Sequence, residues 1–185
     1  MTIQPSPREL IDAVRDNDLA AVEDLLQRGA DVNQKDRWEE PVLILAVNGY
    51  LADMVKLLLA HGASVNAKAP KGETPLMCAV GNVEIMELLI DSGANLDRTD
   101  DNGQTALMWA VRYDEYDSIR LLIDKGAALD MKDDEGMSIH DLAKQSRKPE
   151  ALQQLIESSR HAVAVSKQER LKKLAKKQPK LGGLS

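Results

Sequence analysis

The sequence has few of the residues that hold small secreted domains together or build bulky cores. Its 185 residues include a single cysteine, Cys78, so no disulfide can form within the chain. It has no phenylalanine, two tryptophans and three tyrosines, so a core must be built from Leu, Ile, Val, Ala and Met. No stretch approaches the roughly 18 consecutive apolar residues of a membrane span, and residues 1–7 lack the pattern of a secretory signal. These absences favour a reducing, soluble compartment, and we expect a cytoplasmic protein.

Candidate catalytic and metal-binding groups are also scarce. The chain has three histidines, His61, His140 and His161. None has Cys, Asp or Glu at the spacing of a metal site. Cys78 lies in an apolar segment, which predicts a buried small side chain rather than a reactive thiol. The acidic pairs at 100–101 and 133–134 fall in predicted loops, where a solvated turn is the better interpretation than an acid–base pair. We therefore expect no catalytic residue, metal or cofactor, and no enzyme.

A five-residue pattern that occurs four times is the most informative feature of the chain. It begins with Gly-Ala and covers residues 29–33, 62–66, 93–97 and 126–130. Its glycines are 33, 31 and 33 residues apart, and such a fixed period is typical of stacked repeats. An apolar run with helical spacing precedes each copy. Each glycine is predicted to close a helix in the left-handed conformation, which glycine adopts without steric cost.

A second recurring segment predicts where helices begin. Thr74 and Thr105 each precede an apolar run, and a threonine there can accept a hydrogen bond from a free N–H of the first turn. Pro75 stands at the first helical position, where its missing N–H costs nothing. We therefore predict that each unit consists of a turn, a helix, a short connection, a second helix that ends at a glycine, and an extended segment.

Together these residues resemble the ankyrin repeat, whose pattern is D-x-x-G-x-T-P-L-H-x-A followed by L-L-x-x-G-A-D-V-N. The resemblance is carried by residues 72–79 and 103–110 and by the four Gly-Ala segments. It implies an all-α solenoid of stacked helix-turn-helix units with β-turn or hairpin-like loops between them. We predict an ankyrin repeat domain at 1–159 and a basic tail at 160–185. The five predicted units are 6–35, 36–68, 69–99, 100–132 and 133–159.

Several units depart from the family pattern. The first has Pro-Arg-Glu-Leu at 7–10, which suits a polar N-terminal cap. The second has Trp-Glu-Glu-Pro at 38–41, so its turn is expected to be distorted. The third is two residues short between Ala79 and Ile85, which predicts a tighter link between its helices. The fifth has His140 where leucine is usual and lacks the Gly-Ala ending, as a C-terminal cap would. Two capping units favour a monomer.

Charge divides the chain unevenly. Residues 160–185 hold eight Lys and Arg against one Glu, a net +7, which leaves −13 on residues 1–159 of the total of −6. Within the tail, Ser166 and Glu169 have capping-box spacing and predict a helix near 167–177. An isolated helix of that length is marginal in water, so we expect conditional order.

The resemblance implies that function lies on a concave face made by the loop tips and the first helix of each unit. The loop-tip candidates are Arg37, Trp38, Glu39, Lys71, Glu73, Asp101, Asn102, Gln104, Asp134 and Glu135. The helix candidates are Arg15, Asp16, Asn48, Arg112 and Tyr113. Trp38 lies among charged residues, so it either anchors a partner or folds over the neighbouring loop. Trp109 lies within the apolar start of a predicted helix and is predicted to belong to the core.

We predict a non-enzymatic adaptor or scaffold that binds a partner protein through this face, and the acidity of residues 1–159 favours a basic patch on the partner. One alternative is a regulator or inhibitor whose tail binds nucleic acid, a ribosome or an anionic surface. Its binding residues would be Lys172, Lys173, Lys176 and Lys177. In another alternative the tail folds back on the acidic repeats and competes with the partner. A solvated charge run is the simpler interpretation of the tail.

Overall fold

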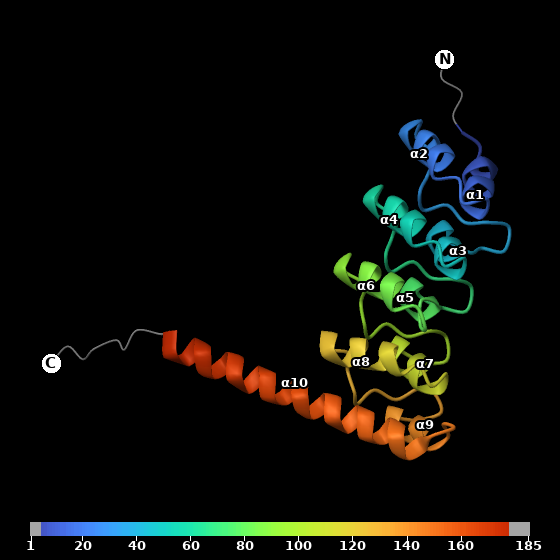
Figure 1. Cartoon of the computed structure of the whole chain (residues 1–185). Helices are drawn as coiled ribbons and strands as arrows, with labels where there is room; N and C mark the ends of the chain where they lie inside the picture. The colour runs from blue at the N-terminus through green and yellow to red at the C-terminus, as the bar shows by residue number, and fades with distance from the viewer. Residues whose placement is uncertain (1–4, 178–185) are drawn as a thin grey trace.

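The computed structural model describes residues 5–177, and this part of the chain forms ten helices arranged in pairs. The first helices of the pairs are α1 (Pro7–Arg15), α3 (Val42–Asn48), α5 (Pro75–Cys78), α7 (Ala106–Arg112) and α9 (Ile139–Lys144). The second helices are α2 (Leu19–Gln27), α4 (Ala52–Ala60), α6 (Val83–Asp91), α8 (Tyr116–Lys125) and α10 (Pro149–Lys177). Figure 1 shows two columns of helices, with long loops projecting on the side of the first helices. This arrangement confirms the predicted all-α solenoid.

The helix boundaries follow from the residues that predicted them. The backbone N–H of Met77 donates to Thr74 Oγ1 at 3.4 Å, and that of Met108 donates to Thr105 Oγ1 at 3.3 Å. Each bond satisfies one of the N–H groups that a helix start leaves free. The Gly-Ala glycines all have left-handed φ values: 90° at Gly29, 86° at Gly62, 89° at Gly93 and 97° at Gly126. The local signals for both helix ends are therefore confirmed.

The last residue of the Gly-Ala pattern joins one unit to the next. Asn33 Oδ1 accepts a hydrogen bond from the Ser64 N–H at 2.7 Å. Asn66 and Asp97 accept equivalent bonds, each at 2.8 Å, from residues 95 and 128. Each of these side chains bonds to the third residue of the Gly-Ala pattern in the next unit. The bonds therefore fix the distance between neighbouring units on the side of the second helices.

The core runs without a break through the units. First helices contribute Leu43, Leu76 and Leu107, and second helices contribute Val55 and Ile119, each at most 2% exposed. Each pair of helices packs on its neighbours along the stack, as expected for a repeat architecture.

The shortened third unit does not have the predicted tighter link. Its first helix, α5, has four residues where α3 and α7 have seven. The connection from α5 to α6, at 79–82, is four residues long, against three at 49–51 and 113–115. The two-residue deletion is therefore absorbed by the helix, because the connection must still reverse the chain direction. The first helix loses its last turn as a result.

The predicted helix start at Ser166 is wrong. Helix α10 runs unbroken from Pro149 to Lys177, through Ser166 and through the predicted boundary at residue 159. Its N-terminal part packs on α8 and α9, and Leu152 and Ile156 are fully buried there. A helix nucleated by this packing needs no separate cap to continue. Figure 1 shows α10 leaving the stack on the side opposite the loops.

Candidate functional site

Buried aspartates shape three of the loop tips. Asp36 Oδ1 accepts hydrogen bonds from the N–H groups of Trp38 and Glu40, at 2.8 and 3.0 Å. Asp100 and Asp133 accept the same pair of bonds from residues two and four positions later. All three aspartates are buried, with at most 6% of each residue exposed. The interpretation of 100–101 and 133–134 as simply solvated turns is therefore wrong for their first residues.

The second oxygen of each aspartate faces the first-helix column. Arg15 Nη2 donates to Asp36 Oδ2 at 2.6 Å, and Arg112 Nη2 lies 3.9 Å from Asp133 Oδ2. In both pairs the arginine is the last residue of a first helix and lies 21 positions before the aspartate. Asp100 Oδ2 instead accepts from the Trp109 indole N–H at 3.0 Å. Trp109 is half-buried: it packs against the core and also faces the loops, so the prediction that it belongs to the core holds only in part.

The third unit lacks such a pair. At the corresponding positions, again 21 apart, the chain has Asn48 and Ala69. The Asn48 side chain turns to the preceding loop and donates to Glu40 Oε1 at 2.8 Å. No guanidinium therefore fills the space in front of this loop.

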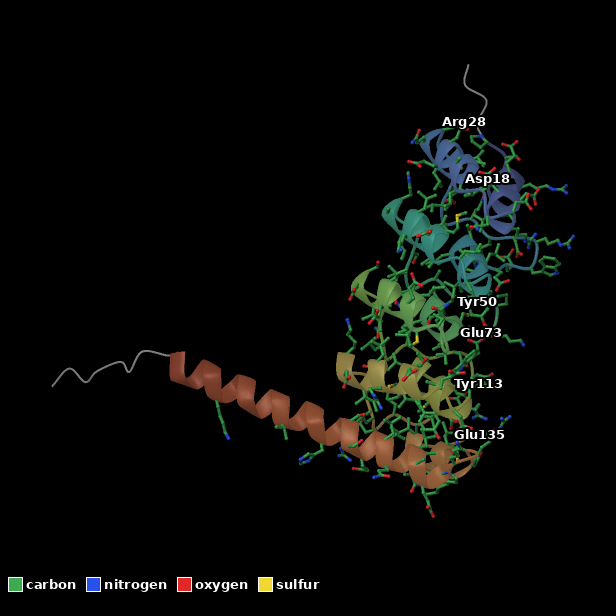
Figure 2. All side chains as sticks on the ribbon, viewed as in Figure 1. Asp18, Arg28, Tyr50, Glu73, Tyr113 and Glu135 are labelled. Atoms are coloured by element: carbon green, nitrogen blue, oxygen red, sulfur yellow. The ribbon has the colours of Figure 1, made fainter. Side chains whose placement is uncertain are left out.

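A groove of about 440 Å³ occupies that space. Its lining residues are Trp38, Glu40, Asn48, Ala69, Pro70, Lys71, Glu73, Cys78 and Trp109, and we call it the Trp38–Trp109 groove. Tyr113 extends its aromatic wall, because its ring meets the Trp109 ring edge to face with centroids 5.9 Å apart. Figure 2 labels Glu73, Tyr113 and Glu135 along the edge of the stack that carries the loops. The short α5 leaves Cys78 at the helix end, in the floor between α3 and α7.

The groove has a negative electrostatic character. Partial burial, followed by the nearby Asp36 and Glu73 carboxylates, raises the pKa of Glu40 above its ordinary value of 4.5. Burial also raises the pKa of the Cys78 thiol to about 12, with Glu73 and Glu40 adding to the shift. In the described part of the chain, the Glu73 side chain has no hydrogen-bond or ion-pair partner.

Trp38 is 57% exposed and is flanked by two arginines. The Arg37 guanidinium carbon lies 3.9 Å from its ring centroid and that of Arg15 lies 5.3 Å away. The two alternatives for Trp38 were an exposed anchor for a partner and a side chain folded over the neighbouring loop. In the structure the ring is exposed to solvent and contacts one arginine of its own unit and one of the preceding unit. Arg37 lines a separate hollow beside α1 with Arg8 and Arg15.

The other predicted binding residues divide into two sets. Trp38, Lys71 and Glu73 meet in the groove, with Tyr113 beside it. The remaining predicted residues lie outside the groove, and some of them form backbone hydrogen bonds that join one loop to the next. The Asp101 N–H donates to the Lys71 carbonyl, and the Asn102 carbonyl accepts from Asp134, both at 3.0 Å. Outside the groove lie Arg37, Glu39, Asp101, Asn102, Gln104 and Arg112.

Sequence reasoning missed Glu40, Cys78 and Trp109 as groove residues. A signal was present for this region, because the Arg-to-Asp spacing of 21 residues holds at two loops, keeps only the aspartate at Ala79 and Asp100, and loses both residues at Asn48 and Ala69. Of the predicted tail residues, Lys172 is exposed. The side chains of Lys173, Lys176 and Lys177 lie outside the described part of the structure.

Among the side chains that the structure describes, no group of three or more His, Cys, Asp or Glu could hold a metal ion. Over the same described residues, no helix combines the length and apolar character needed to cross a bilayer.

Comparison with known proteins agrees with this architecture. The sequence pattern described as ankyrin repeats (three copies) matches residues 10–100 and 81–168. The chain is 38% identical over 79 residues to a mouse (Mus musculus) protein named 2-5A-dependent ribonuclease. The aligned residues make up 42% of the chain and 11% of that protein. The chain is 39% identical over 85 residues to the Caenorhabditis elegans ankyrin repeat and KH domain-containing protein mask-1, covering 44% of the chain and 3% of the relative.

A third relative, zygote-specific protein 3 of Chlamydomonas reinhardtii, is 40% identical over 80 residues, covering 43% of the chain and 21% of that protein. The matched segments are thus a small part of each relative. The similarity therefore concerns the repeats and not the rest of these proteins. The repeat pattern itself extends over most of the chain, and the chain belongs to the ankyrin-repeat family.

Proposed function

We propose that this protein is a non-enzymatic interaction module that binds a partner protein through the concave face. The observation that carries the proposal is the cluster of partly exposed aromatic rings on that face, Trp38, Trp109 and Tyr113, around the Trp38–Trp109 groove. Tryptophan and tyrosine at the centre of an interface contribute most of the binding energy in many complexes. Membership of a family whose repeats generally bind proteins supports the same proposal.

The rigidity of this face also favours binding. Trp109 is held by its bond to Asp100 and by Tyr113, and the loop that carries Trp38 is held by Asp36. A partner therefore meets side chains that are already ordered, so less entropy is lost on binding.

The test is affinity capture from nuclease-treated lysate with three baits made from the full chain. The baits are the unaltered protein, a face variant with Trp38→Ala and Tyr113→Ala, and a tail variant in which Lys172, Lys173, Lys176 and Lys177 are changed to Gln. The proposal expects a protein that the unaltered and tail-variant baits retain and the face variant loses. Retention by a correctly folded face variant would contradict it.

Helix α10 supports a second candidate function. It extends beyond the stack (Figure 1) and exposes Lys172 to solvent. Lysines at 172, 173, 176 and 177 recur with helical spacing. We propose as the alternative that this segment binds nucleic acid or another anionic surface. Binding of an arbitrary duplex should then weaken steeply with salt, and absence of binding at low salt would contradict the alternative. Because α10 points away from the loops, its direction does not favour self-competition.

A further inference from the structure

We infer that the Trp38–Trp109 groove takes a lysine or arginine side chain of the partner protein. The inference rests on the proposed function and specifies the chemistry of the partner at the centre of the face. It follows from what fills the same place in the neighbouring units, from the charge of the groove and from its aromatic walls.

The loops of the second and fifth units have a cation of the chain in the equivalent place, and the fourth loop has the Trp109 indole N–H. Arg15 occupies it in front of Asp36, where its guanidinium also lies against the Trp38 ring. Arg112 occupies it in front of Asp133. In front of the third loop the chain supplies Asn48, which is uncharged and donates to Glu40 of the preceding loop. The space in front of the third loop therefore holds no cation of the chain, whereas the second and fifth loops each have an arginine there.

The charges around this opening suit a cation from outside. Glu40 and Glu73 both line it, and Glu73 has no internal partner among the described residues. Of the nearby positive groups, Arg15 is paired with Asp36 and Arg37 is stacked on Trp38. Lys71 lies in the groove wall without an ion pair in the described residues and partly offsets the two carboxylates. The pKa of Glu40 is raised first by its partial burial and then by the Asp36 and Glu73 carboxylates, which agrees with a site that an added cation would stabilise.

The walls favour the same ligand. A Lys or Arg cation over a tryptophan face is attracted by the ring electrons, and more strongly where water is excluded. The Trp109 indole is fixed by its N–H bond to Asp100 and by the Tyr113 ring. A cation that enters therefore meets aromatic surface and carboxylates together, as Arg15 does with Trp38 and Asp36.

The experiment uses the full chain labelled with nitrogen-15. The chain has two tryptophans and both line the groove, so each of its two indole N–H signals responds to a ligand in the groove. The probes are acetylated peptides Gly-Ala-Gly-X-Gly-Ala-Gly in which X is arginine, lysine or citrulline, the neutral analogue of arginine. They are titrated to about 10 mM, because one side chain is expected to bind in the millimolar range.

We expect the arginine and lysine peptides to shift both indole signals saturably and the citrulline peptide to bind at least about fivefold more weakly. Combining Glu40→Gln with Glu73→Gln should reduce the preference for arginine over citrulline to the part that the aromatic rings supply. The matched control combines Glu23→Gln with Glu135→Gln, which removes the same charge from α2 and from the fifth loop and should leave the preference unchanged.

Equal binding of arginine and citrulline, or a preference that the Glu40 and Glu73 changes do not reduce, would overturn the inference. So would the absence of indole shifts with all three peptides. None of these results touches the proposed function, which fails only if the face variant still captures the partner. The two failures are therefore separate.

Discussion

Arg15, the last residue of α1, donates from Nη2 to Asp36 Oδ2 at 2.6 Å and so ties the first unit to the loop of the second. The same carboxylate receives two backbone N–H groups of that loop through its other oxygen. The loop that presents Trp38 thus depends on a side chain from the preceding unit. Arg112 and Asp133 hold the same relative positions, but at 3.9 Å their contact is an ion pair without a hydrogen bond.

Removing Arg15 should destabilise the fold more than removing an exposed arginine. Arg15→Ala leaves Asp36 Oδ2 without its partner on a side chain that is 1% exposed, a loss of about 1–3 kcal/mol in the free energy of unfolding. The control is Arg28→Ala, whose pair with Asp24 is exposed and contributes less than about 1 kcal/mol. Urea unfolding of both variants measures the difference, and equal losses would show that the Asp36 pair does not stabilise the loop.

Tyr50 has a strained backbone conformation. It is 68% exposed and has φ +56°, a left-handed conformation that costs a bulky side chain free energy. Asn17 has the same conformation in the equivalent turn of the first unit. We expect Tyr50→Asn to stabilise the fold by about 0.5–1 kcal/mol, because asparagine tolerates this conformation.

Tyr113→Asn is the matched control for that change. Tyr113 is also exposed but has φ −95°, and its ring packs on Trp109. The same substitution should there give no gain. If thermal unfolding showed Tyr50→Asn to be neutral or destabilising, backbone strain at Tyr50 would not be a significant cost.

Cys78 should react slowly despite lining the groove. Its pKa of about 12 keeps it protonated near neutral pH, and only the thiolate attacks alkylating reagents. With iodoacetamide at pH 8, we expect alkylation more than about tenfold slower than that of a cysteine-containing peptide. Mass spectrometry over time measures the rate. Alkylation as fast as that of the peptide would mean that the groove floor is fully solvated.

Stability should respond to Glu40 in a pH-dependent way. Because folding raises the pKa of Glu40 above 4.5, protonation favours the folded state. The contribution is fully present below pH 4.5 and is lost as pH rises through the raised value. The groups around Glu40 are Asp36, Glu73, Arg15 and the Asn48 amide.

Glu40→Gln resembles the protonated form, so we expect it to raise the free energy of unfolding at pH 7 and to have little effect near pH 3. Urea unfolding at both pH values measures this, with the exposed Glu23→Gln as a control for the loss of one charge. A lower stability of Glu40→Gln at pH 7 would reverse the predicted sign.

The parts of the fold that were predictable from the sequence depend on local chemistry. Thr74, Thr105 and the four Gly-Ala glycines act within one turn of a helix end, so their types and spacing suffice. The solenoid follows because the same local unit recurs at a nearly constant period.

The groove was only partly predictable because its features depend on neighbouring units. In the sequence, Trp109 is one of a run of apolar residues in a predicted helix. Its hydrogen bond to Asp100 depends on where the fourth loop lies, which the sequence pattern does not specify. The two-residue deletion was visible, but whether the helix or the connection absorbs it depends on packing across α3 and α7. The helix start expected at Ser166 was overridden in the same way, since contacts with α8 and α9 nucleate α10 more than twenty residues from the end of the helix.

The most direct test of the concave face is the affinity of a captured partner, measured by calorimetry for the face variant and for a control variant. We expect Trp38→Ala with Tyr113→Ala to weaken binding by at least about 30-fold, or roughly 2 kcal/mol, as for aromatic residues at the centre of an interface. The control, Tyr50→Asn, changes an exposed tyrosine that is not among the groove-lining residues and should alter the affinity less than about twofold. Full affinity in the face variant, or a larger loss in the control, would contradict the account.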